Sequence, residues 1–199
     1  MAGPAARRGL PAPVPSTLPP ATATCMFLFV LLYLALVIVR PQEYPALVDW
    51  GVPVLQIALG GAFLLWIFGA RKDFGAPQFP LLFAFLFVLM LSLAVNGWLG
   101  GTLDQLSRFG PIVAAFVLVA NSVTTHRRAR ILMATLVLCT LVPAVHGIDQ
   151  KAKGIGWTGV GLIQEDGRIQ YLGIFNDPND LGMLFVIALP MALLLSRGG

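Results

Sequence analysis

Residues 168–195 read RIQYLGIFNDPNDLGMLFVIALPMALLL, a polar segment that passes directly into an apolar run. The run, Leu181 to Leu195, contains no charged residue and indicates a membrane-spanning helix. Polar groups at the edge of a membrane are costly unless they are capped, solvated or used. We therefore expect function to show in the polar segment that opens this helix.

The composition of the whole chain is that of a membrane protein. Of its 199 residues, 57% are hydrophobic and 11% are charged, and the mean hydropathy is +0.83. A soluble domain carries roughly 25% charged residues, so an ordinary soluble domain is excluded. The net charge of +4 is unevenly distributed along the chain. We interpret it as a topology signal and expect no nucleic-acid partner.

The distribution of apolar residues predicts an all-α polytopic transmembrane helical bundle with about six spans. A helix needs about 20 residues to cross the hydrocarbon core. One segment, Phe109–Val123, is short by this measure, and we expect it to be tilted, locally thinned or partly re-entrant. The six predicted spans are Thr22–Val39, Val52–Ala70, Pro80–Val95, Phe109–Val123, Ile131–Ile148 and Pro178–Leu195.

The N-terminal region has a different composition from the spans. Residues 1–21 are rich in Ala, Pro and Arg, and we predict a disordered cytoplasmic tail there, with residues 22–199 forming the transmembrane region. A cleaved signal peptide is the alternative. The first apolar run is too long for one and lacks a small-residue cleavage site, which favours a retained span.

Charges alternate between the two sets of connections. The tail, the second and fourth connections and the C-terminal end hold eight of the 13 basic residues and one acid (Arg7, Arg8, Arg71, Lys72, Asp73, Arg127, Arg128, Arg130 and Arg197). The other connections hold the remaining five basic residues and eight acids. Basic residues gather on the cytoplasmic side of membrane proteins. The pattern therefore predicts a cytoplasmic N-terminus and an external fifth connection, residues 149–177.

The start of the last span has the chemistry of a helix cap. Asp177 suits the N-cap, Pro178 the first helical position and Asp180 the third. A cap needs fewer polar residues than this segment has, and Arg168 precedes it on the same side. Exposed helix amides beside a guanidinium could hold a phosphate, which the acids would oppose unless they contact sugar hydroxyls. The residues leave capping and phosphate binding both open.

Two motifs resemble a known family. Arg168, followed by Gly173-Ile-Phe-Asn-Asp-Pro-Asn-Asp180 and an apolar helix, resembles the O-antigen ligase and polymerase superfamily. The Asp-Pro-Asn-Asp form, together with Arg40-Pro-Gln-Glu-Tyr44 after the first span, is similar to the branch described as exosortase-associated putative O-glycosylation ligases. The arrangement of spans agrees with this family over most of the chain.

The resemblance implies a multi-pass protein of the bacterial inner membrane that acts on a lipid-linked glycan. Such enzymes transfer a glycan from a polyprenyl diphosphate to an acceptor at the outer face of that membrane, without a metal or other cofactor. The family's large external loop, with its essential histidine, follows the region matched here. The resemblance therefore implies that this chain is the N-terminal half of such an enzyme, either a fragment or a truncated product, and it leaves the acceptor unidentified.

The resemblance also assigns roles to individual residues. Arg168 corresponds to the family's basic residue before the motif and would contact the diphosphate. Arg40 would be a second external basic group, or an arginine that extends from the end of a span to the membrane surface. The motif residues would cap the helix, shape the site or contact the glycan: Asn176, Asp177, Asn179 and Asp180. No residue is assigned as catalytic, and the general base is expected to lie outside the chain.

Two other functions remain open from the residues alone. A transporter or flippase-like protein would carry ionisable residues in the middle of its spans, and these spans are almost free of them. A non-catalytic membrane assembly partner is the second alternative. His146 and Asp149 share one helix face and could act as a base and its orienting group, but a structural role for a single interfacial histidine is favoured.

Overall fold

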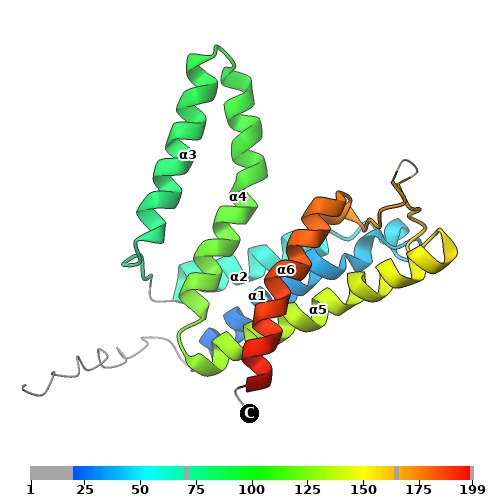
Figure 1. Cartoon of the computed structure of the whole chain (residues 1–199). Helices are drawn as coiled ribbons and strands as arrows, with labels where there is room; N and C mark the ends of the chain where they lie inside the picture. The colour runs from blue at the N-terminus through cyan, green and yellow to red at the C-terminus, as the bar shows by residue number, and fades with distance from the viewer. Residues whose placement is uncertain (1–19, 70–71, 164–165, 198–199) are drawn as a thin grey trace, which may run out of the picture.

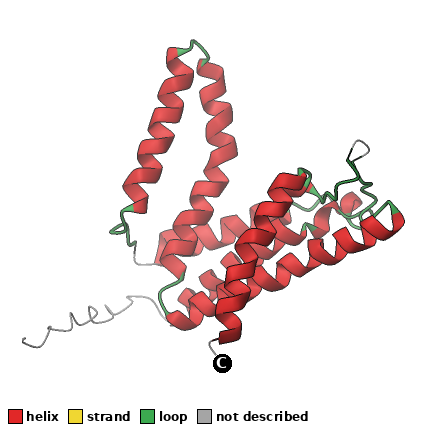
Figure 2. Cartoon of the chain, viewed as in Figure 1, coloured by secondary structure: helices red, strands yellow, loops and turns green. Residues whose placement is uncertain are grey.

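A computed structural model describes residues 20–69, 72–163 and 166–197. This part of the chain is all-α, with an isolated β-bridge between Ile155 and Gly161 and no β-strand (Figure 2). The elements in order are α1 Pro20–Val39, η1 Pro41–Glu43, η2 Val48–Trp50, α2 Val54–Gly69, α3 Gln78–Val95, α4 Leu99–Ser122, α5 His126–Lys153, η3 Gly173–Phe175 and α6 Pro178–Arg197.

Helix lengths support a multi-pass membrane protein. Five helices, α1, α3, α4, α5 and α6, are long and apolar enough to cross a membrane. The remaining helix, α2, is apolar but has 16 residues. At about 1.5 Å per residue it is about 24 Å long, less than the roughly 30 Å of a hydrocarbon core. The six predicted segments thus form six helices, one of which is short. The proposed tail falls mainly in residues 1–19, outside the described residues.

The fourth helix corrects the prediction of a short span at Phe109–Val123. α4 runs from Leu99 to Ser122 and has 24 residues, about 36 Å of helix. The polar stretch before Phe109 is itself helical, and Arg108 pairs there with Asp104 at 3.1 Å. This pair joins residues four apart on one helix face, as expected from their spacing. A helix of this length is long enough to cross the membrane without local thinning or re-entry.

Side-chain contacts gather one set of connections at one end of the molecule. The guanidinium of Arg128, at the start of α5, lies over the ring of Phe27 in α1 at 5.2 Å and donates to the carbonyl oxygen of Ser122 at 2.9 Å. The amide of Asp73 donates to Oδ1 of Asn121 at 2.7 Å. The start of α1, the α2–α3 connection and the α4–α5 connection therefore lie together. The charge pattern predicts the cytoplasmic side for all three.

The helices form a packed group and a projecting hairpin. α1, α2, α5 and α6 lie together, while α3 and most of α4 extend away from them (Figure 1). One hydrophobic cluster joins the group to the base of the hairpin: Met26, Val30, Ala62, Trp66, Phe79, Val117 and Leu118. Further along, α3 exposes large apolar side chains, among them Leu81, Phe83, Phe85 and Phe87. Such side chains are suited to contact with lipid.

The sidedness predicted from charge is testable at the two ends of α5. Thr124, just before α5, and Ala152, in its last turn, are both exposed. In a background with Cys25 and Cys139 replaced by alanine, we expect Ala152→Cys to react with a membrane-impermeant maleimide in intact cells. Thr124→Cys should react only after the membrane is opened. The reverse pattern would contradict the predicted orientation.

Candidate functional site

The fifth connection folds back over the ends of α1 and α5. A second hydrophobic cluster lies there, formed by Ile38, Tyr171, Phe175 and Leu181. Tyr171 is fully buried. The cluster packs the segment that leads into α6 against the last turn of α1, at the end of the molecule opposite the Arg128 contacts. The end of α1 and the segment before α6, which are far apart in the sequence, are thus in contact.

A pair of tyrosines ties this segment to the end of α1. The Tyr171 hydroxyl donates to the carbonyl oxygen of Val39 at 2.6 Å. The Tyr44 hydroxyl lies 2.7 Å from the Tyr171 hydroxyl. Because the single proton of Tyr171 is used on Val39, Tyr44 is the donor in the second bond. Burial raises the pKa of Tyr171, and the hydrogen bond with Tyr44 and the charge of Glu43 raise it further. Tyr171 therefore stays neutral well above physiological pH.

The base of the connection is held by a fully buried glutamine. The amide nitrogen of Gln150 donates to the carbonyl oxygens of Val160 and Gly161, each at 3.0 Å. Its amide oxygen accepts from the backbone N–H of Gln170 at 3.0 Å. One side chain on α5 thereby fixes both arms of the connection. The polar groups of this glycine-rich segment are thus organised around α5.

His146 belongs to the same support. Its Nε2 lies 2.8 Å from the Thr158 hydroxyl, and its ring packs edge-on against Trp157 and Tyr171 at 4.9 and 5.0 Å between centroids. The ring is fully buried. Asp149 pairs instead with Lys153 at 2.5 Å. These contacts match the structural role favoured for His146.

Arg40 lies against the segment that leads into α6. It has a φ of 50° and is the one non-glycine residue with a positive φ among the described residues. Its guanidinium forms an ion pair with Glu43, and its side chain is 16% exposed. Gly173 also has a positive φ, and a Cβ at that position would overlap the guanidinium. The two motifs of the sequence, 40–44 and 168–180, therefore meet at Arg40 and Gly173.

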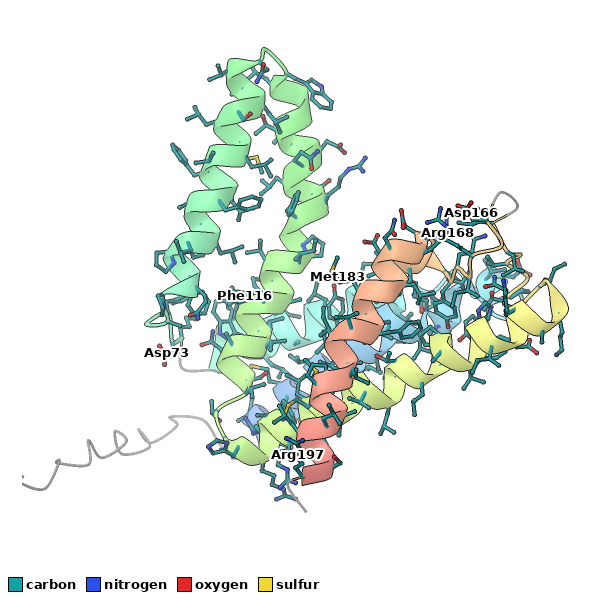
Figure 3. The ribbon with its side chains drawn as sticks, viewed as in Figure 1. Asp73, Phe116, Asp166, Arg168, Met183 and Arg197 are labelled. Carbon is teal, nitrogen blue, oxygen red and sulfur yellow. The ribbon has the colours of Figure 1, made fainter. Side chains whose placement is uncertain are left out.

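Arg168 is placed differently from Arg40. Its side chain is 50% exposed and forms an ion pair with Asp166 at 2.7 Å. Both residues lie at the surface near the start of α6, as Figure 3 shows. An exposed pair of this kind contributes little to stability, so the guanidinium is available to another anion. The structure thus brings Arg40, and not Arg168, into contact with the motif backbone.

The start of α6 confirms the predicted cap. α6 begins at Pro178. Oδ1 of Asp177 accepts from the backbone N–H of Asn179 at 2.7 Å, and its carbonyl oxygen accepts from Leu181 at 3.1 Å. The other three predicted site residues, Asn176, Asn179 and Asp180, are exposed beside this helix start. Their contacts with a glycan stay a prediction.

The site combines cations, acids and a helix start at one end of the molecule. In the described ranges 20–69, 72–163 and 166–197, no three His, Cys, Asp or Glu side chains gather in a way that could hold a metal ion. The groups that are present offer hydrogen bonding and charge stabilisation. Exposed helix amides and guanidinium groups suit a phosphorylated or polyhydroxylated ligand.

No family model matches the chain, and no curated protein or solved structure is significantly similar to it. The site is therefore interpreted from its own residues. Sequence reasoning missed the tyrosine pair and Gln150. The spacing of Gln150 four residues after His146, on one face near the end of a predicted span, was the available signal for a polar helix end.

The contact between Arg40 and Gly173 predicts a strict requirement for glycine. Gly173→Ala should destabilise the protein by about 1–2 kcal/mol from the left-handed backbone alone, and further through the displaced guanidinium. Gly51→Ala is the matched control, because Gly51 has the same left-handed backbone (φ 61°) and a Cβ there meets nothing within 4 Å. Thermal unfolding in detergent measures both. Equal melting temperatures for the two variants would contradict the contact.

The raised pKa of Tyr171 predicts that the free energy of unfolding falls at high pH. Its folded pKa is raised above the ordinary 10.0, so its contribution is complete below about pH 10 and is lost as the pH rises beyond that value. Tyr171→Phe lacks both the hydrogen bond and the titration. We expect the wild type to be more stable at pH 8 by about 1–3 kcal/mol, with the difference shrinking above pH 10. A pH-independent difference in chemical unfolding would contradict this assignment.

Proposed function

We propose that this chain is part of an O-antigen-ligase-like membrane glycan transferase. The reaction is attack by an acceptor hydroxyl on the anomeric carbon of a sugar carried by a polyprenyl diphosphate, at the periplasmic face of a bacterial inner membrane. One observation carries the proposal. The two motifs on which the family resemblance rests meet in space, with Arg40 packed on Gly173.

The groups at this end of the molecule suit a departing diphosphate. Fixed cations and helix amides stabilise the negative charge that develops on a leaving phosphate, and this electrostatic effect is commonly the largest contribution to catalysis. Arg168 stands at the surface near the start of α6. Its partner Asp166 is exposed, so exchanging that carboxylate for a diphosphate has a small cost. We assign the diphosphate contact to Arg168.

The acids of the motif have separate roles. Asp177 is used as the cap of α6, which removes one of its oxygens from ligand binding. Asn176, Asn179 and Asp180 remain exposed, and amide and carboxylate groups form hydrogen bonds with sugar hydroxyls. We assign these three residues to the glycan, with the amides of Asn176 and Asn179 able to donate and accept and the carboxylate of Asp180 only to accept. His146 is buried against Thr158 and receives no catalytic role.

The distribution of charge favours a transferase over an ion-coupled transporter. α1, α2 and α3 contain no Asp, Glu, Lys or Arg, whereas a coupled transporter places ionisable groups near the middle of its spans. In α4, Asp104 and Arg108 are exposed and pair with each other. A non-catalytic assembly partner is the remaining alternative, and the next experiment separates it.

Replacement of Arg168 tests the proposal. The gene is altered in place in its own organism, so that every other component is present. Arg168→Ala should lower glycan transfer roughly 10- to 100-fold, the loss expected for a charge-assisted hydrogen bond to a phosphate. Arg168→Lys should restore only part of it, because lysine lacks the planar fork of donors. The readouts are glycan on the acceptor fraction and accumulated polyprenyl-diphosphate glycan.

The matched control is Arg108→Ala. Arg108 is also an exposed arginine paired with an aspartate, so its loss should leave transfer unchanged. Normal transfer by Arg168→Ala, with the protein present in the membrane, would remove the diphosphate assignment. If the chain is a non-catalytic assembly partner, Arg168→Ala should leave transfer normal, whereas deletion of the gene should abolish transfer.

A further inference from the structure

The segment after α1 contains polar atoms that are shielded from water and unpaired. Both side-chain amide atoms of Gln42, Nε2 and Oε1, are buried without a hydrogen-bond partner among the described residues, and so is Nε of Arg40. Buried polar atoms in folded proteins are nearly always paired, and an unpaired one costs free energy. Gln150 is the contrast, because its buried amide makes three hydrogen bonds.

The backbone at the same place is held in an unfavourable conformation. Arg40 adopts a left-handed φ of 50° directly before η1. For a residue with a side chain this conformation is uncommon, and such strain concentrates at binding and catalytic sites. Gly173, which has no Cβ, provides the space for the Arg40 guanidinium. Strain and unpaired atoms therefore coincide over three residues, 40–42.

The chemistry of this cluster selects a class of ligand. An amide side chain offers donors and an acceptor side by side, and a phosphate at neutral pH offers mainly acceptors. Glu43 already offsets the charge of Arg40 and would repel an anion. A neutral group with its own donor and acceptor fits better. Neighbouring hydroxyls of a sugar, or the acetamido group of an N-acetylated sugar, have this arrangement.

We propose that Gln42, with Arg40 and Glu43, forms a sugar-binding subsite that recognises the glycan and not the diphosphate. This inference rests on the proposed transferase function, because that function makes the glycan a part of the donor substrate. Arg40 and Glu43 retain 16% and 36% side-chain exposure and form the outer part of the subsite.

Binding and stability are measured together on the full chain in lipid nanodiscs. The probes are N-acetylglucosamine and inorganic pyrophosphate, followed by ligand-observed NMR titration. Gln42→Ala should weaken binding of N-acetylglucosamine about tenfold or more, as expected for the loss of two hydrogen bonds, and leave pyrophosphate binding unchanged. The free Gln42→Ala protein should melt at the same or a higher temperature, because the replacement removes a buried unpaired amide.

Gln56→Ala is the control, since Gln56 is an exposed glutamine in the first turn of α2. It should bind both probes as the wild type does. The inference is overturned if the wild type shows no saturable binding of N-acetylglucosamine, or if Gln42→Ala keeps wild-type affinity for it. It is also overturned if Gln42→Ala melts at a lower temperature, because the amide would then have a structural role.

The outcome is separable from that of the transferase proposal. Sugar binding that depends on Gln42, in a protein whose Arg168→Ala variant transfers glycan normally, keeps the subsite and removes the diphosphate assignment. Glycan transfer that depends on Arg168, with the donor KM unchanged by Gln42→Ala, removes the subsite and keeps the transferase.

Discussion

The hydrogen bond from the Tyr171 hydroxyl to the carbonyl oxygen of Val39 joins the fifth connection to the end of α1, and the candidate site depends on it. The last carbonyls of a helix have no partner within the helix, and at a membrane boundary an unpaired carbonyl is costly. Tyr171 satisfies one of these groups from a segment 132 residues further along the chain. The same bond places Gly173 two residues from a fixed point, where it meets Arg40.

This arrangement explains how nearly uncharged spans can support a polar site. α1, α2 and α3 contribute apolar packing and lipid contact. The polar groups of the site lie in the segments between helices and in the first turn of α6, and His146 and Gln150, buried on α5, support the fifth connection. In the proposed transferase, this end is the one that water and the acceptor reach.

Hydropathy was sufficient to predict the class of fold, because apolar runs of this length have few stable forms other than membrane helices. It failed at the start of α4, where Asp104, Ser107 and Arg108 resembled a connection. Local pairing of Asp104 with Arg108 allows the helix to continue through them. The cap at Asp177 was predictable because a cap depends on three or four neighbouring residues. The contact of Arg40 with Gly173 was not, because it depends on how α1 and the fifth connection pack together.

The length of α2 affects the lipid around the protein. A hydrophobic helix shorter than the membrane is accommodated by compression of the bilayer beside it, at a modest free-energy cost for each ångström of mismatch. On its other side α2 packs against α1, whose last turn leads into Arg40 and the segment 40–44. Lipids with acyl chains of a different length would change the position that α2 adopts in the bilayer, and through this contact the position of α1. We therefore expect the thickness of the bilayer to act on the segment 40–44.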